Sequence, residues 1–321
     1  MELPSPLRAA VDQMLAGEPL ERLAKASALL SDRYRREVRD GRFHIDDALA
    51  AKAYLATRMP ATYAAVRAAL SMVEDVAPDF EPRTQIDLGS GPGTAFWAAQ
   101  DAWPQMQSAD MVEASAAIRS VGDALARHAT VMARWHAGDV TGKIPALAPA
   151  DLVTLAYVLD ELPPATIAAV TTKLWALTTD MLVIIEPGTT AGWQRILAVR
   201  ETLKAAGAHL VAPCSHEHDC PIEVPDWCHF SRRVARSRVH RLAKGAEVPW
   251  EDEKFIFIAA SRSPITLAGA RVLSPAALAV SSSVVPTGRR ARSHSASAME
   301  TRSSKSAAPI GATASTWRVE P

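Results

Sequence analysis

Short apolar runs alternate along the chain with stretches that repeat apolar residues at helical spacing. The clearest runs, Asp151–Tyr157 and Met181–Glu186, are almost continuously apolar, which is typical of buried parallel strands. Further strands are expected at Thr84–Ile86, before Glu113, before Asp139, at His209–Pro213 and at Lys254–Ser261. Helical patterns at 94–103, 116–128, 163–178 and 190–207 separate the strands. The pattern therefore predicts an α/β fold with a Rossmann-like, seven-stranded sheet.

The regions before and after this sheet differ from it in pattern. Residues 1–80 carry apolar residues at helical spacing and predict a helical region, broken at Arg58–Pro60 because proline disfavours helix in the residue before it. Residues 81–265 form the predicted sheet domain, with a cysteine-rich insertion at 213–230 before the last strand. After about residue 275 serine and alanine dominate, so residues 266–321 are expected to be a low-complexity, disordered tail.

The first predicted strand ends at Asp87 and breaks into the glycine-rich turn Gly89–Gly93. Glycine allows positive φ and a close approach of ligand to backbone, and the next helix points its N-terminus at that ligand. Two later strands also end in an acid, Glu113 for ribose hydroxyls and Asp139 for an adenine amino group. The turn resembles motif I of class I S-adenosylmethionine (SAM) methyltransferases, which implies their fold and cofactor. The predicted cofactor-binding residues are Asp87, Gly89, Ser90, Gly91, Gly93, Glu113 and Asp139.

The chain has three cysteines, and all of them lie within fifteen residues. Cys214, Cys220 and Cys228 have the spacing Cys-x5-Cys-x7-Cys. An odd, clustered set argues against a disulfide framework, whereas thiolates on an irregular loop suit zinc or an iron–sulfur cluster. We therefore predict that the three cysteines bind one metal site, the alternative being ordinary reduced cysteines.

Formal net charge is zero, so the overall charge indicates no partner. The segment from Arg232 to Lys244, however, holds five arginines, one lysine and no acid. It predicts a basic helix that neutralises phosphates, with Arg232, Arg233 and Arg236 as RNA contacts; a solvated helix face is the alternative. No apolar run approaches the ~18 residues that span a bilayer, and no signal-peptide pattern is present. A soluble, cytoplasmic protein is expected, and a monomer.

Further segments together resemble the Rsm22 family, methyltransferase-like proteins of the mitochondrial small ribosomal subunit with bacterial relatives. The resemblance spans about residues 25–275 and rests on Leu30–Arg35, Tyr54–Tyr63, Leu159–Leu162, Ile185–Thr189, Ala212–Cys214, Asp226–Ser231 and Glu251–Phe255. It implies a methyltransferase-like fold, association with the small ribosomal subunit or its RNA, and a [4Fe–4S] cluster on four cysteines.

The chain departs from the family pattern because it lacks the fourth cysteine, expected after the last strand. Two explanations stay open. In one, the tail is native and His216, His218 or His229 completes the site, which suits zinc better than a cluster. In the other, the tail is out-of-frame translation that has removed the fourth ligand.

The predicted function is SAM binding by a protein that acts on, or binds, small-subunit ribosomal RNA during ribosome assembly. No Asn-Pro-Pro-Tyr follows the fourth strand, and Tyr157, Asp160 and Glu161 occupy that corner. Either acid is a candidate proton acceptor, although a polar start to the next helix is the preferred interpretation. The alternatives are an assembly factor without methyl transfer and a small-molecule methyltransferase. The helical region at 1–80 is interpreted as a cap over the cofactor cleft or as an RNA-facing lobe.

Overall fold

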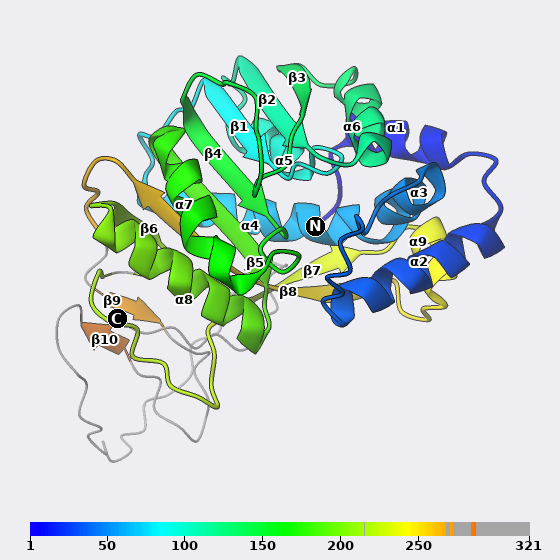
Figure 1. Ribbon diagram of the computed structural model, residues 1–321. Helices are drawn as coiled ribbons and strands as arrows, with labels where there is room; N and C mark the ends of the chain where they lie inside the picture. Colours follow the sequence, from blue (N-terminus) through cyan, green and yellow to red (C-terminus); the bar gives the residue numbers. More distant parts are fainter. Residues whose placement is uncertain (215, 268–269, 273–283, 287–321) are drawn as a thin grey trace, which may run out of the picture.

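A computed structural model describes residues 1–214, 216–267, 270–272 and 284–286 (Figure 1). Its strands are β1 (Thr84–Leu88), β2 (Ser108–Glu113), β3 (Met132–Ala137), β4 (Ala150–Ala156), β5 (Thr178–Pro187), β6 (His209–Ala212), β7 (Phe230–Ala235), β8 (Trp250–Ser261), β9 (Ala270–Val272) and β10 (Val284–Pro286). Its helices are α1 (Ser5–Leu15), α2 (Leu20–Arg35), α3 (Ala48–Thr57), α4 (Met59–Val76), α5 (Thr94–Ala102), α6 (Ala116–Ala126), the 3₁₀ turn η1 (Pro164–Thr166), α7 (Ile167–Ala176), α8 (Thr190–Ala205) and α9 (Arg238–Lys244).

Seven strands form one continuous sheet in the order β3-β2-β1-β4-β5-β8-β6. The five strands from β3 to β5 pair in parallel, and β8 runs antiparallel to both of its neighbours, β5 and β6. The chain adds β2 and then β3 on one side of β1. It then crosses back and adds β4 and β5 on the other side of β1, so its direction of winding reverses between β1 and β4. The predicted doubly wound α/β sheet is confirmed, and ligands of such sheets bind at this reversal point.

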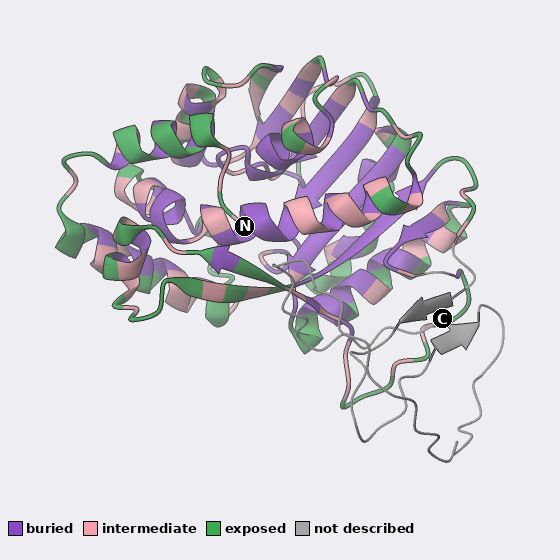
Figure 2. Cartoon of the chain, turned by 180° about the vertical axis from the view of Figure 1, so that it is seen from behind, coloured by how far each residue is buried: buried purple, intermediate pink, exposed green. Residues whose placement is uncertain are grey.

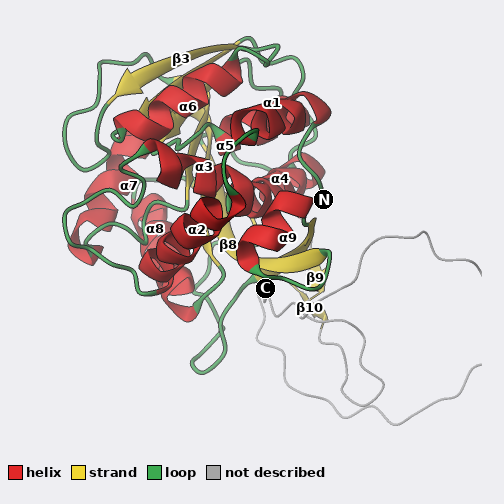
Figure 3. Cartoon of the chain, turned by 90° about the vertical axis from the view of Figure 1, so that its right-hand side faces the viewer, coloured by secondary structure: helices red, strands yellow, loops and turns green. Residues whose placement is uncertain are grey.

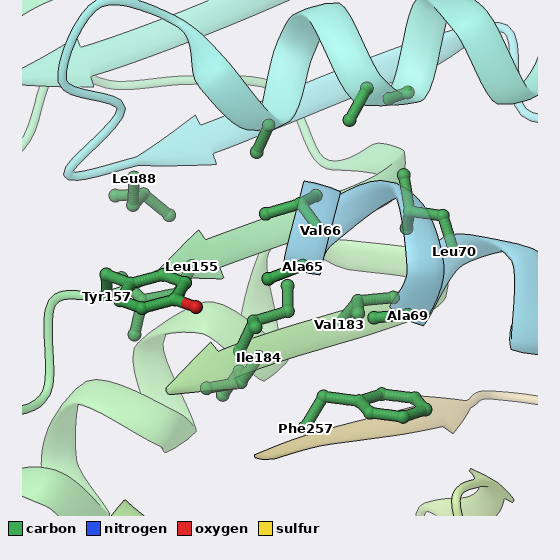
Figure 4. Close-up of a cluster of buried hydrophobic side chains, with 14 of the residues drawn as sticks. Ala65, Val66, Ala69, Leu70, Leu88, Leu155, Tyr157, Val183, Ile184 and Phe257 are labelled. Carbon is green, nitrogen blue, oxygen red and sulfur yellow. The ribbon is translucent and has the colours of Figure 1, made fainter. Parts of the chain in front are cut away.

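Helices cover both faces of the sheet. In Figure 1, α7 and α8 lie in front of it and α4 behind, and Figure 2 shows the same sheet from behind with α4 across it. Ala65, Val66 and Ala69 of α4 lie next to Val183 of β5 (Figure 4), and all four side chains are completely buried. The small alanines let α4 approach the sheet closely, which packs the core densely behind the ends of β4 and β5.

The basic run does not form the single helix expected from the sequence. Arg232 and Arg233 lie on β7, Arg236 follows it, and only residues 238–244 are helical, as α9. β7 is an eighth strand that pairs with the first half of β8, from Trp250 to Phe255. The prediction of a basic helix over 232–244 is therefore wrong, and the cysteine-rich segment is followed by this added strand instead of by a helix.

The N-terminal region is helical as predicted, with α3 ending at Thr57 and α4 beginning at Met59. Figure 3 shows α2, α3 and α9 close together at one side of the molecule. Among the described residues, no helix is both long and apolar enough to cross a membrane. Within the predicted tail, β9 and β10 form a short antiparallel pair, and residues 268–269, 273–283 and 287–321 lie outside the described part of the chain.

Candidate cofactor site

The turn after β1 takes a conformation that glycine adopts readily. Gly89, Gly91 and Gly93 have φ of +64°, +55° and +82°. A Cβ at Gly89 would lie 2.5 Å from a methyl group of Val158, so the turn packs tightly against the end of β4 there. A Cβ at Gly91 would meet nothing within 4 Å, because this glycine faces open space.

Glu113, at the end of β2, holds this turn in place. Its Oε2 accepts a hydrogen bond of 2.9 Å from the Gly91 amide, and its Oε1 accepts one of 2.7 Å from the Ser115 amide. Ser115 in turn donates its hydroxyl to the carbonyl of Ile45, which ties the N-terminal region to the sheet. Burial raises the pKa of Glu113, although these backbone donors act against the shift.

The other two predicted acids differ in their surroundings. Asp87 is buried, accepts one hydrogen bond of 2.7 Å from the Thr154 hydroxyl, and its Oδ2 has no hydrogen-bond partner among the described residues. Burial raises the pKa of Asp87 to about 7. Burial also raises the pKa of Asp139. Hydrogen bonds from the amide and hydroxyl of Thr141 lower it by more, so the pKa of Asp139 lies below its usual value.

These residues surround a cavity of about 450 Å³ at the reversal point of the sheet. Six of the seven predicted cofactor residues line it; the seventh, Gly93, begins α5 and lies against the ring of Trp135 instead. The opposite wall comes from the N-terminal region, through Tyr34, His44, Tyr54 and Arg58. The N-terminal helices and the connection between α2 and α3 therefore cover the cavity, as the cap interpretation requires.

The end of β4 supplies the third wall. Tyr157 has a φ of +59°, an unfavourable conformation for a tyrosine, and its hydroxyl donates to Glu253 over 3.0 Å. Glu161 lines the cavity, and burial together with the carboxylates of Asp160 and Glu113 raises its pKa to about 8. Asp160 is buried outside the cavity lining. Both acids precede η1 and α7, so neither starts a helix as the sequence had suggested.

The predicted metal ligands lie on an irregular segment, which we call the cysteine loop (residues 213–229). Cys214, Cys220 and Cys228 line one small cavity of about 30 Å³ between α8 and β8, together with His216. His216 is buried, and neither of its ring nitrogens has a hydrogen-bond partner among the described residues. Within that same part of the chain, no three His, Cys, Asp or Glu side chains are gathered closely enough to hold a metal.

The predicted RNA contacts are partly neutralised by acids of β8. Arg233 forms two hydrogen bonds with Asp252, of 2.9 and 3.1 Å, and Arg236 lies 3.0 Å from Glu251. Arg232 is exposed. The Arg233 guanidinium also stacks over the half-exposed ring of Trp250, with 5.5 Å from its carbon to the ring centroid.

Comparison with protein families shows which family this chain belongs to. Residues 48–295 match the family model described as mitochondrial small ribosomal subunit Rsm22. The chain belongs to the Rsm22 family. The match includes the glycine turn, the cysteine loop and the added strand β7, and the fold is that of class I methyltransferases, as predicted.

Two curated relatives match the chain at moderate identity. The human protein named ribosome assembly protein METTL17, mitochondrial, is 30% identical over 194 residues, which are 56% of this chain and 42% of that protein. The Schizosaccharomyces pombe Rsm22-cox11 tandem protein 2, mitochondrial, is 26% identical over 217 residues, 59% of this chain and 28% of its own length. The chain thus spans less than half the length of these relatives.

Solved methyltransferases resemble this Rsm22-family chain more distantly. The magnesium protoporphyrin IX methyltransferase of Synechocystis with bound SAM covers 81% of this chain and 98% of its own at 14% identity, with a TM-score of 0.42. An O-methyltransferase family protein of Burkholderia thailandensis covers 77% of this chain and 73% of its own at 12% identity, with a TM-score of 0.47. At these scores, the strand order and the family match carry the fold assignment.

Sequence reasoning missed the cap's contribution to this Rsm22-family site. Tyr34, His44, Tyr54 and Arg58 line the cavity from α2, the segment before α3, α3 itself and the break before α4. Two stretches on which the family resemblance rests, Leu30–Arg35 and Tyr54–Tyr63, contain three of the four. The sequence did not indicate their role, because polar and aromatic residues in or beside a helix have no spacing that is typical of a ligand site.

Proposed function

We propose that this protein binds SAM in the glycine-turn cavity and works on the RNA of the small ribosomal subunit during its assembly. The observation that carries the proposal is the hydrogen bond from the Gly91 amide to Glu113, which holds the turn open beside a cavity large enough for a cofactor. Support for the ribosomal role comes from the family match and from the name of the human relative.

The residues of the cavity suit the parts of SAM. Glu113, Asp139 and Gly91 all line it. We expect Glu113 to accept hydrogen bonds from ribose hydroxyls and Asp139 from the adenine amino group, and the methionine moiety to lie against the glycine turn. SAM, when bound, supplies the activated methyl group. The chain's own contribution is to bind and orient the cofactor and to exclude water beneath the cap.

Titration calorimetry with SAM tests the proposal. Glu113→Ala removes charge-assisted hydrogen bonds of about 1.5–3 kcal/mol each, so SAM should bind at least about tenfold more weakly. Ser108→Ala, at the start of β2 and away from the cavity, is the matched control. Wild-type protein that binds no SAM at high micromolar concentration would overturn the cofactor proposal.

A non-catalytic assembly factor is the second candidate, and the corner after β4 favours it. Methyltransferases that act on amino groups hold the target nitrogen there with Asn-Pro-Pro-Tyr, whereas here the Tyr157 hydroxyl is already bonded to Glu253. Incubation with methyl-labelled SAM and immature small subunits separates the two functions. Label in the RNA supports the enzyme, and co-sedimentation without label supports the assembly factor.

We also propose that Cys214, Cys220 and Cys228 hold one metal site, with His216 as the fourth ligand. All four line one cavity, and the unpartnered ring nitrogens of His216 are the observation that singles it out among the loop's histidines. Three thiolates and an imidazole suit zinc, while the family resemblance favours [4Fe–4S]. Protein purified without oxygen should carry one zinc or be brown with iron, and His216→Ala should lose metal while His229→Ala keeps it. Metal-free wild-type protein would refute this site.

RNA binding is proposed for the surface of β7 and α9. Arg232 and Arg238 are exposed cations of this surface, and the exposed Arg233, paired with Asp252, offers a stacking platform over the Trp250 ring. Neutralising Arg232 and Arg238 together should weaken binding to small-subunit RNA and lower the salt-dependence slope by up to about two. Arg127→Ala, on exposed α6 surface at the other end of the sheet, serves as the control. Equal binding by all three proteins would show that this surface is merely solvated.

A further inference from the structure

Arg58 is a cation of the cavity whose role the proposed cofactor contacts do not explain. It stands at the break between α3 and α4, where its backbone φ of −113° interrupts the two helices. The break turns the chain, and the Arg58 side chain lines the cavity beside Tyr34, Tyr54 and Thr62. The residue is only partly exposed.

In the described part of the chain, no carboxylate lies within ion-pair distance of the Arg58 guanidinium. Two other arginines near the cavity are paired. Arg39 lies 3.0 Å from Glu37 and donates two hydrogen bonds to the Asp160 carbonyl, and Arg195 is paired with Glu37 and Glu186. The nearest compensation for Arg58 is the Tyr34 ring, 5.4 Å from its guanidinium carbon to the ring centroid. Glu253 is close enough to raise the pKa of Arg58, but its carboxylate already accepts the Tyr157 hydroxyl.

A half-buried guanidinium with no directly paired anion is costly, and an anionic ligand at hydrogen-bond distance would lower the cost. The remaining charged groups of the cavity's sheet side are acids, Asp87, Glu113, Asp139 and Glu161. These acids suit the hydroxyls, the ammonium group and the sulfonium of SAM, and none of them suits its one anionic group. We propose that Arg58 binds the carboxylate of the methionine moiety, with the hydroxyls of Tyr54 and Thr62 beside it. This inference rests on the proposed cofactor.

A phosphate of RNA is the rival anion, and the position of Arg58 argues against it. The guanidinium lies 5.4 Å from the centroid of the Tyr34 ring on α2 and close to Glu253 on β8, and the residue is only partly exposed. A single carboxylate at the end of a flexible side chain fits such a partly exposed position better than the backbone of a polynucleotide.

Calorimetry with two ligands tests the inference directly. Decarboxylated SAM keeps the adenosine, the sulfonium and the amine but lacks the carboxylate. Wild-type protein should bind SAM about tenfold or more tightly than decarboxylated SAM. Arg58→Gln should lose that factor for SAM and change less than about twofold for decarboxylated SAM. Arg58→Lys, which keeps the charge but not the two-pronged geometry, should lie between the two for SAM.

The outcomes separate this inference from the cofactor proposal. Wild-type binding of both ligands with equal affinity, or an equal loss of both in Arg58→Gln, overturns the role of Arg58 and leaves SAM binding standing. Wild-type binding of neither overturns the cofactor proposal and the inference together. Loss of RNA affinity in Arg58→Gln, with SAM affinity unchanged, assigns the guanidinium to phosphate and also overturns it. If Arg58→Gln melts well below wild type, the comparison is made with Arg58→Lys.

Discussion

The glycine turn and the cysteine loop each follow a strand of the same sheet, yet they are held in place differently. The turn is fixed by bonds within the methyltransferase core. Gly89 and Ser90 donate their amides to the Val112 carbonyl, and Gly91 donates to Glu113. The described residues of the cysteine loop form no helix or strand. They are tied down by side chains of other elements, such as Arg200 of α8, which donates to the His216 and His218 carbonyls.

The difference indicates two ways of building a site. The cofactor cavity is preformed, because its walls are parts of the sheet and cap that the core already orders. The cysteine loop has little core of its own, so its order depends on neighbours and on any metal that it binds. Four substitutions test this contrast, from the largest expected effect to the smallest.

Gly89→Ala should disrupt the preformed site most strongly. The new Cβ would lie 2.5 Å from Val158, at a φ of +64° that alanine disfavours. Overpacking and backbone strain together should cost about 3–5 kcal/mol of unfolding free energy, measured by chemical denaturation. Gly91→Ala is the control, because its Cβ meets nothing within 4 Å and only the strain of about 1–2 kcal/mol remains. Equal losses in the two variants would contradict this account of the turn.

Asp87→Asn should make stability depend less on pH. Because burial raises the pKa of Asp87 to about 7, the folded protein keeps a proton there that the unfolded chain loses near pH 4. Stability of the ligand-free protein therefore falls as pH rises from about 4 to about 7. Relative to wild type, Asp87→Asn should gain about 2–3 kcal/mol between pH 5 and pH 8. Urea denaturation at both pH values measures this gain, and the same difference at both would refute it.

Arg200→Met should loosen the cysteine loop and leave the glycine turn unchanged. Arg200 is almost completely buried, and its loss leaves two loop carbonyls without a donor, at a cost of about 2 kcal/mol. Hydrogen exchange should quicken at residues 213–229 and stay as in wild type at 87–93. Lys204→Met, one turn further along α8, removes one ion pair with exposed Glu201 and one with the fully exposed Asp219 of the loop, so it should change exchange in either segment far less. Faster exchange at the glycine turn would show that the two sites are not independent.

Glu251→Gln should cost about 1–2 kcal/mol, because two cations and the His240 ring contact this half-buried carboxylate. Lys244, Arg236 and His240 lie 2.9, 3.0 and 3.3 Å from it. Asp252→Asn, which breaks only the exposed pair with Arg233, should cost less than about 0.5 kcal/mol. Thermal melting of the two variants gives the comparison, and a larger effect of Asp252→Asn would reverse it.

The sheet could be predicted because its central strands are recognisable from their hydrophobic pattern. Asp151–Tyr157 and Met181–Glu186 are apolar enough to be buried on both faces, and each predicted strand lies where the structure has one. β7 could not be predicted in the same way. Only Phe230 and Val234 of this strand are buried, and a separation of four residues fits a helix face as well as a strand face.

The site could be predicted only from its sheet side. Glycines and strand-end acids mark the turn, and six of the seven chosen residues line the cavity. The cap side could not be predicted, because the break at Arg58 directs its side chain through tertiary packing that no local pattern records. Cofactor contacts, metal ligation and RNA contacts by the chosen residues remain predictions.

The three consecutive acids of β8 contact three different parts of the molecule. Glu251 pairs with Lys244 of α9, Asp252 with Arg233 of β7, and Glu253 with Tyr157 at the cavity. Side chains of a strand alternate between faces, so removing or adding one residue here would exchange all three assignments and turn Phe255 out of the core. During the divergence of the family, this stretch is thus expected to accept changes of residue far more readily than changes of length.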